Sequence, residues 1–182
     1  MVRVKGEICL PKIESVNKNN FGDIPNPCRQ CLYWQTSEPF DEKKLKPEIA
    51  QKKREWFNKV AKEFGSCIKI VYFNNVPIGL IQYAPAKFFP RVKEYAAGPP
   101  SEDAVFIACL YITNKEVRGK GLGTKMLENF LVEIKERGFK AVETFARKSS
   151  VNNPSGPLKL YLKHGFKIKN DKDDFPLVRL ES

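Results

Sequence analysis

Two long stretches of the chain carry apolar residues at helical spacing. Pro47–Phe64 repeats them every three or four positions, starts with a proline suited to a first helical turn, and is followed by Gly65. Thr124–Arg137 has the same pattern and is followed by Gly138. Each stretch therefore predicts an amphipathic helix that ends at a glycine.

Shorter apolar runs predict strands. Cys67–Phe73 and Val76–Ala84 flank Asn74-Asn75, a pair typical of a tight hairpin turn. The other predicted strands are Arg3–Ile13, Val105–Thr113, Phe139–Ala146, Phe166–Asn170 and Pro176–Leu180, and a short helix is predicted over Pro154–His164. Because this order mixes hairpins with a strand–helix–strand crossover, it predicts an α+β fold around one mixed sheet.

The length and composition of the chain favour one globular domain. Its 182 residues suffice for a sizeable core, so we expect a single domain over residues 1–182, within which residues 1–45 are irregular. No apolar run approaches the roughly 20 residues that a membrane-spanning helix needs, and the N-terminus lacks the apolar core of a signal peptide. We therefore expect a cytoplasmic protein with mostly reduced cysteines, no membrane partner and an oligomeric state left open.

The chain is basic, with 32 Lys and Arg against 21 Asp and Glu and a net charge of +11. Such a balance favours an anionic partner, either nucleic acid or a phosphate-rich cofactor, unless the basic residues only solvate the surface. They are spread along the chain among acidic neighbours, which disfavours nucleic acid.

A loop with glycines at alternate positions, Arg118–Gly123, joins the predicted strand Val105–Thr113 to the helix Thr124–Arg137. Alternating glycines let the backbone turn tightly and approach a ligand, and a helix N-terminus attracts phosphate. The loop lacks the Gly-Lys-Ser/Thr of a Walker loop, and its spacing G-x-G-x-G differs from the G-x-G-x-x-G of a dinucleotide fingerprint. A phosphate-binding turn of another class and a plain packing turn remain as interpretations.

Arg118, Gly121 and Gly123 fit the pattern R-x-x-G-x-G. With the strand before it and the helix after it, this segment resembles the acyl-CoA-binding motif of the GNAT superfamily of N-acyltransferases. About 40 residues downstream, Pro157–Phe166 resembles a helix of the same superfamily that ends in Tyr, Gly and Phe. The two matches and the element order cover residues 67–180, which the resemblance identifies as an acyl-CoA-binding core.

The resemblance implies the GNAT fold, a single mixed, mostly antiparallel sheet with splayed central strands flanked by helices. It implies that the pantetheine arm of acetyl-CoA lies between Val105–Thr113 and Phe139–Ala146, and that the diphosphate lies on the glycine loop. The residues assigned to this cofactor site are Leu110, Tyr111, Ile112, Arg118, Gly119, Lys120, Gly121, Leu122, Gly123, Thr124 and Asn153. The implied reaction transfers the acetyl group to a primary amine of a small molecule or peptide, without a metal. The alternative is a non-catalytic acyl-CoA-binding or nucleic-acid-binding module.

Two residues are assigned to catalysis. Tyr161 matches the tyrosine of the superfamily's downstream helix, which implies that it protonates the leaving thiolate. Many members carry a glutamate where this chain has Cys109, so the resemblance supplies no general base. Glu143 on the neighbouring strand is our prediction for the base, and the alternatives are Glu102, Asp103 and a base acting through water.

The irregular N-terminal region contains Cys28-x-x-Cys31. No second C-x-x-C accompanies it, so the pair is interpreted as ordinary thiols, as lining of a substrate pocket, as a metal site or as a redox pair. His164, the only histidine, ends a predicted helix and is interpreted as a cap. Aromatic residues of irregular segments belong either to the core or to the wall of an acceptor pocket; they are Tyr33, Trp34, Phe40, Phe88, Phe89 and Tyr95.

Overall fold

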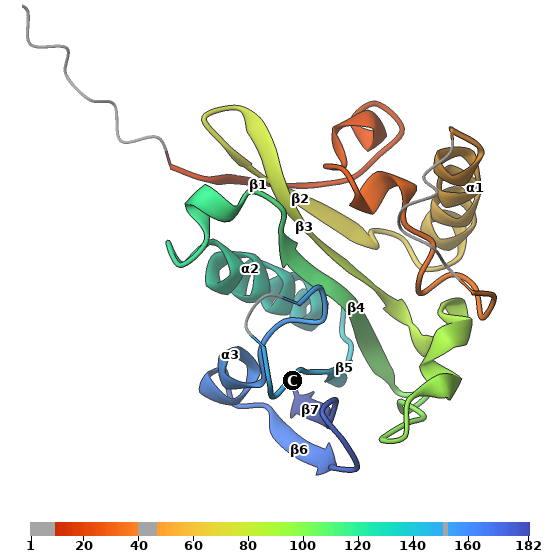
Figure 1. Cartoon of the computed structure of the whole chain (residues 1–182), viewed down its shortest axis with the longest axis vertical. Helices are drawn as coiled ribbons and strands as arrows, with labels where there is room; N and C mark the ends of the chain where they lie inside the picture. The colour runs from red at the N-terminus through yellow and green to blue at the C-terminus, as the bar shows by residue number, and fades with distance from the viewer. Residues whose placement is uncertain (1–9, 40–46, 151–152) are drawn as a thin grey trace, which may run out of the picture.

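The described residues form one seven-stranded sheet with helices on both faces (Figure 1). The computed structural model describes residues 10–39, 47–150 and 153–182. Its strands are β1 (Lys12–Ser15), β2 (Ile68–Phe73), β3 (Val76–Pro85), β4 (Ala104–Ile112), β5 (Ala141–Phe145), β6 (Lys167–Asn170) and β7 (Leu177–Glu181). Its helices are α1 (Pro47–Glu63), α2 (Leu122–Glu136) and α3 (Leu158–Lys163). The strand order is β1-β2-β3-β4-β5-β7-β6; β4 and β5 run parallel, and every other pair of neighbours in this sheet is antiparallel.

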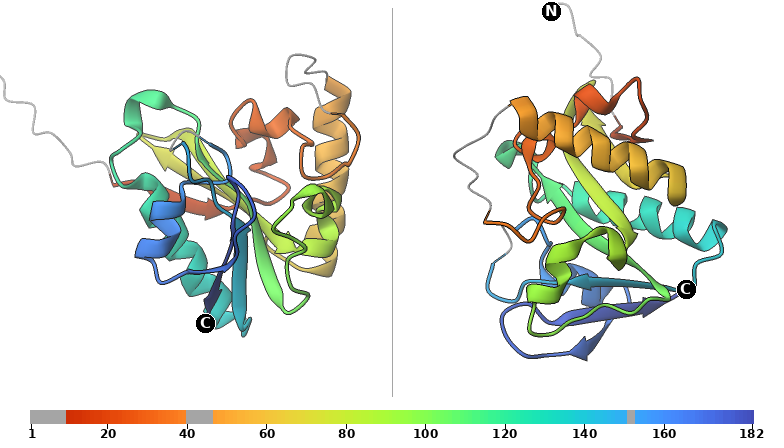
Figure 2. Two further views of the ribbon diagram at one scale, coloured as in Figure 1. Left: turned by 60° about the horizontal axis from the view of Figure 1, so that its bottom comes forward. Right: turned by 90° about the vertical axis from the view of Figure 1, so that its right-hand side faces the viewer.

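The two faces of the sheet each carry a separate apolar core. Helix α1 packs on one face through Phe57 and Val60, beside 3₁₀ turns at Ala86–Phe88 and Pro90–Glu94. Helices α2 and α3 cover the opposite face (Figure 2), where Phe130 and Tyr161 are fully buried. No helix in the described segments of the chain is long and apolar enough to cross a membrane.

Most of the predicted elements are confirmed. Helix α1 ends one residue before Phe64, and the hairpin β2–β3 turns at Asn74 and Asn75, whose φ angles of 52° and 60° suit a tight turn. The prediction of an α+β fold with one mixed, mostly antiparallel sheet is also confirmed.

Three boundaries differ from the prediction. Helix α2 begins at Leu122, two residues earlier than predicted, so its first turn lies inside the glycine loop. Helix α3 begins only at Leu158, because Gly156 has a φ of +81° and Pro157 is extended. For the first strand, predicted over Arg3–Ile13, residues 3–9 lie outside the described residues, Leu10 is exposed and not in a strand, and β1 begins at Lys12.

A bulge in β4 opens the centre of the sheet. Gln82 and Tyr83 of β3 pair with Cys109 and Ile107 of β4, so Ala108 is an extra residue on β4. The parallel ladder between β4 and β5 stops at Phe106 and Glu143, and beyond it the Thr144 hydroxyl donates to the Ile107 carbonyl at 2.8 Å. The C-terminal halves of β4 and β5 therefore separate, as predicted for the two central strands.

Candidate functional site

The glycine loop leads directly into the N-terminus of α2. Gly119 and Gly121 both have a φ of +77°, a left-handed conformation that residues with a Cβ rarely adopt. Gly121 caps the helix, and its carbonyl accepts the backbone N–H of Lys125 at 3.0 Å. The N–H groups of Leu122, Gly123 and Thr124 precede this bond, so they have no partner inside the helix and remain available to an anion.

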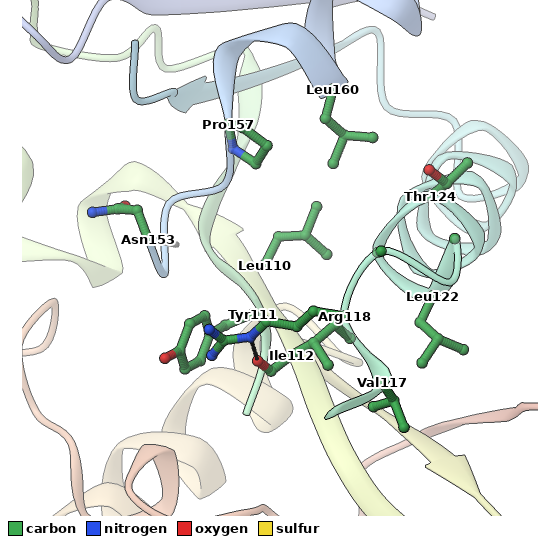
Figure 3. A pocket seen from close by; sticks show the side chains of 13 residues that line it. Leu110, Tyr111, Ile112, Val117, Arg118, Leu122, Thr124, Asn153, Pro157 and Leu160 are labelled. Carbon is green, nitrogen blue, oxygen red and sulfur yellow. Dashed lines mark hydrogen bonds between the residues drawn. The ribbon is translucent and has the colours of Figure 1, made fainter. Parts of the chain in front are cut away.

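A cavity of about 490 Å³ lies in front of this turn, between the end of β4 and the start of α3 (Figure 3). We call it the loop cavity. Its lining residues are Leu110, Tyr111, Ile112, Val117, Arg118, Gly119, Gly121, Leu122, Gly123, Thr124, Asn153, Pro157 and Leu160. All residues predicted for the cofactor site line it except Lys120, which is exposed. Sequence reasoning missed Val117, Pro157 and Leu160.

Arg118 fastens the loop to β4. Its Nε donates to the Ile112 carbonyl at 2.8 Å, and its guanidinium lies 4.9 Å from the centre of the Tyr111 ring (Figure 3). The Leu122 side chain is buried in the α2 core, so it anchors the first turn of α2 against the sheet. The loop thus has a fixed position relative to the strand edge.

The segment 153–157 covers two donors that face the gap between β4 and β5. The Leu110 N–H donates to the Pro154 carbonyl at 2.7 Å, and the Tyr161 hydroxyl donates to the Ser155 carbonyl at 2.8 Å. Tyr161 is fully buried and lines neither cavity described here. Burial raises the pKa of its hydroxyl above the ordinary value of 10, against a hydrogen bond with Thr144 that lowers it.

Glu143 pairs with Phe106, at the other end of the parallel ladder between β4 and β5. Phe106 lies four residues before Leu110 on β4, which at about 3.3 Å per residue is roughly 13 Å. Its carboxylate is fully buried and accepts hydrogen bonds from the Ser101 N–H (2.7 Å), from Lys169 (2.8 Å) and from Arg179 (3.0 Å). Burial tends to raise the pKa of Glu143, but these donors outweigh it and hold the pKa below its usual range.

These contacts argue against the predicted role of Glu143 as the base. A carboxylate saturated by two cations is a weak proton acceptor, and it lines neither cavity. Of the alternatives, Asp103 binds Arg179 at the same end of the sheet.

A second, smaller cavity of about 90 Å³ lies on the α1 face of β4, and we call it the α1 cavity. It is lined by Pro27, Cys28, Cys31, Trp34, Gln35, Lys53, Leu80, Gln82, Cys109, Tyr111 and Pro154. Cys109 packs against the α1 core, whereas Leu110 belongs to the α2 core, so the two cavities lie on opposite faces of β4. They adjoin at Tyr111, which lines both, and at the neighbours Asn153 and Pro154.

The structure places the cysteines and the histidine that the sequence singled out. Cys28 and Cys31 line the α1 cavity, as one interpretation of the C-x-x-C pair predicted, and Cys109 lies there too. Burial raises the pKa of the Cys109 thiol, and the other two cysteines add to the shift. Within the described ranges no group of three His, Cys, Asp or Glu residues could hold a metal ion. His164 caps α3, with Nδ1 at 2.8 Å from the Leu160 carbonyl.

The aromatic residues of the irregular segments serve mainly as core. Trp34 and Phe89 are buried, and Trp34 stacks on Tyr95 at a centroid distance of 5.2 Å while also lining the α1 cavity. The Tyr33 and Tyr95 hydroxyls lie 3.0 Å apart. Phe40 lies outside the described residues.

Residues 28–166 match the model of the acetyltransferase (GNAT) family. The chain belongs to this family. Its fold is similar to that of the PaiA N-acetyltransferase of Thermoplasma acidophilum, solved in complex with coenzyme A, with a TM-score of 0.61 and 15% identity over 95% of this chain and 99% of that one. An N-acetyltransferase of Staphylococcus aureus Mu50 gives a TM-score of 0.61 and 18% identity over 94% and 98% of the two chains.

Naa50 of Arabidopsis thaliana, solved with the bisubstrate analogue CoA-Ac-MVNAL, gives a TM-score of 0.54 and 14% identity over 93% of this chain and 97% of that one. A comparison with curated protein sequences found no significant match. The structural similarities therefore describe the fold of this GNAT protein, while its substrates have to be argued from its own residues.

The polar residues of the α1 cavity were not predicted, although the sequence held a signal for two of them. Lys53 lies four residues after Ile49 and four before Phe57, on the apolar stripe of α1, where a lysine breaks the pattern. Gln82 likewise interrupts the apolar alternation of β3. For Gln35, in an irregular segment, no such signal exists.

Proposed function

We propose that this GNAT protein transfers an acetyl group from acetyl-CoA to the primary amine of a small molecule or peptide, by direct attack within a ternary complex. The observation that carries the proposal is the pair of cavities on opposite faces of β4, which adjoin at Tyr111. The loop cavity has a helix start that can bind a diphosphate, and the α1 cavity lies on the other face of the strand, so donor and acceptor have separate places.

In this proposal the loop cavity holds acetyl-CoA. The diphosphate lies on the N–H groups of Leu122, Gly123 and Thr124, where the helix dipole favours negative charge. The uncharged pantetheine arm follows the edge of β4 towards Leu110, because strand-edge amide groups match its amides. This path brings the thioester to the place where the two cavities adjoin.

The segment 153–157 has to shift for this geometry. Its Pro154 carbonyl accepts the hydrogen bond of the Leu110 N–H, and its Ser155 carbonyl accepts that of the Tyr161 hydroxyl. Movement of the segment would release both donors together, one for the carbonyl oxygen of the thioester and one for the sulfur. Donor binding and assembly of the catalytic groups would therefore be coupled.

The proposed chemistry is a single displacement at the thioester carbonyl. The neutral amine attacks the carbonyl carbon, the C–N bond forms, and the C–S bond of the tetrahedral intermediate breaks. Nitrogen loses one proton and sulfur gains one, so the balance needs no other reactant. Tyr161, protonated because burial raises its pKa, donates to the departing sulfur.

Among the described residues no carboxylate or histidine lines the α1 cavity, so we assign no protein base to the amine. The amine then has to arrive neutral or lose its proton through water. This distinguishes the protein from family members that carry a glutamate at the position of Cys109.

The test is release of free thiol from acetyl-CoA in the presence of a panel of primary amines, with the acetylated product identified by mass spectrometry. Amine-dependent thiol release is the expected result. Tight binding of CoA without turnover on any amine would support a non-catalytic acyl-CoA-binding protein. Salt-dependent binding of nucleic acid that CoA does not displace would support a nucleic-acid-binding module.

A further inference from the structure

The α1 cavity contains a buried lysine without an acidic partner. Lys53 is 3% exposed, and its ammonium donates to the Cys31 carbonyl at 3.0 Å and to Gln82 Oε1 at 2.5 Å. No carboxylate lies within 4.0 Å of it among the described residues. An ammonium has three N–H donors, so one donor is left for a ligand, and the charge is met only by the Trp56 ring, whose centre lies 5.5 Å away. A buried charge without a counter-charge is costly, which favours an anionic ligand.

Two amides beside Lys53 leave one donor and one acceptor unused. Gln35 Nε2 donates to Gln82 Oε1 at 3.2 Å, and the Gln82 side-chain N–H₂ and Gln35 Oε1 are buried without a partner. The orientation of Gln82 follows from Lys53, because an ammonium has to face the amide oxygen and not the amide nitrogen. Gln82 is 1% exposed and lines the cavity, so its unpaired donor carries a desolvation penalty that a hydrogen bond to a ligand would relieve.

The remaining groups thus consist of two donors, on Lys53 and Gln82, and one acceptor, on Gln35. Two adjacent donors with a positive charge match a carboxylate, and the carbonyl oxygen of Gln35 matches an amine N–H. The other walls are apolar, aromatic or thiol side chains, among them Trp34, Leu80 and Tyr111. A volume of about 90 Å³ holds roughly six to nine water-sized groups at about 10–15 Å³ each, which is the size of a small amino acid.

We propose that the α1 cavity selects an acceptor that carries a carboxylate as well as its amine, that is, a small free amino acid. The carboxylate binds Lys53 and the Gln82 amide N–H, and the amine binds Gln35 Oε1. The thioester then reaches the amine from the loop cavity, which adjoins at Tyr111. The transfer step rests on the proposed function, whereas the binding of the carboxylate does not.

The first experiment compares matched acceptors, glycine and alanine against glycinamide and alaninamide, in the thiol-release assay. The wild type should use the acids with a kcat/KM at least tenfold higher than the amides, compared at equal concentrations of neutral amine. Lys53→Met keeps the length of the side chain and removes the charge, and should bring the acid-to-amide ratio close to one. Lys87→Met removes an exposed lysine charge and should leave the ratio unchanged.

A second variant guards against misfolding of Lys53→Met. Gln82→Glu supplies Lys53 with an internal carboxylate, so the fold is retained while the site for an external carboxylate is filled. It should lower kcat/KM for the acids at least tenfold more than kcat/KM for the amides, whereas loss of structure alone would lower both equally. Equal or better use of the amides by the wild type, or an unchanged ratio in Gln82→Glu, would overturn the proposal.

A binding measurement separates this proposal from the proposed function. N-acetylalanine is titrated by calorimetry into each protein in the presence of CoA. It should bind to the wild type at least tenfold more tightly than it binds to Gln82→Glu. If no amine gives turnover but this binding is found, the acetyl transfer is wrong and the carboxylate site stands. If amines are acetylated without regard to a carboxylate and N-acetylalanine does not bind, the site is wrong and the transfer stands.

Discussion

Replacing Gly123 with alanine should make the free protein more stable and the complex with CoA weaker. Gly123 is the second residue of α2, its φ is not left-handed, and no heavy atom lies within 4 Å of an added Cβ. A methyl group therefore fits the ligand-free protein, and replacing a helical glycine by alanine stabilises by about 0.5–1 kcal/mol. For a protein of this length that raises Tm by about 1–4 °C.

The same methyl group would stand in the loop cavity, where the diphosphate is proposed to approach the backbone. A tenfold loss of CoA affinity corresponds to about 1.4 kcal/mol. At a CoA concentration of about 100 times the wild-type Kd, the ligand stabilises the wild type by about 2.7 kcal/mol and the variant by about 1.4 kcal/mol. The order of the two melting temperatures should therefore reverse when CoA is added.

Thermal unfolding with and without CoA, together with calorimetric titration of CoA, measures both effects. Gly22→Ala is the matched control, because Gly22 also has open space around its Cβ position and lies in a 3₁₀ helix that does not line the loop cavity. It should leave the Kd for CoA unchanged. A Gly123→Ala variant that is more stable yet binds CoA as tightly as the wild type would refute the placement of the diphosphate on this turn.

Three further predictions concern the chemistry. Because no carboxylate or histidine of the described segments lines the α1 cavity, the rising limb of kcat/KM with pH should follow the acceptor. It should move by about one pH unit between two amines whose pKa values differ by about one unit, and a limb at fixed pH would indicate a protein base. Tyr161→Phe should lower turnover at least tenfold with CoA affinity little changed, whereas Tyr83→Phe, which removes another buried hydroxyl, should lower only stability; equal turnover in both variants would remove Tyr161 from the mechanism. Glu143→Gln should cost on the order of 3 kcal/mol of unfolding free energy near neutral pH and leave the shape of the pH–rate profile intact. Since the folded-state pKa of Glu143 is lowered, its contribution is present above about pH 4.3 and is lost as the pH falls through the folded value, so chemical unfolding should show wild type and variant converging in acid.

The elements set by local spacing could be predicted from the sequence. The helix Pro47–Glu63, the hairpin at Asn74 and Asn75, and the glycine loop depend on residues close together in the chain, and the structure shows all three. The predicted start of α3 is wrong because the helical pattern continues backwards through Gly156 and Pro157, whose backbone conformations exclude a helix.

The surroundings of single polar side chains could not be predicted in the same way. Glu143 lies on the expected strand, but its partners Lys169 and Arg179 come from β6 and β7, which the order of elements alone does not place beside it. In the sequence Lys53 is one lysine among many, since a charged residue on the apolar stripe of a helix shows its partners only once the sheet beneath it is known. The residues that line the α1 cavity thus come from segments far apart in sequence.

The extra residue Ala108 keeps β3 and β4 from pairing regularly, so its deletion would change the centre of the sheet. Ala108 and Cys109 both face the α1 core, so the alternation of side chains across β4 pauses for one position and then resumes with Leu110 on the α2 side. Deleting Ala108 would leave every later side chain of the strand on its present face and allow an unbroken ladder with β3. The shortened protein would gain regular pairing and lose the bend that separates β4 from β5. A single extra alanine thus weakens the pairing of β4 with β3 and, in the proposed function, opens the path along which the thioester reaches Leu110.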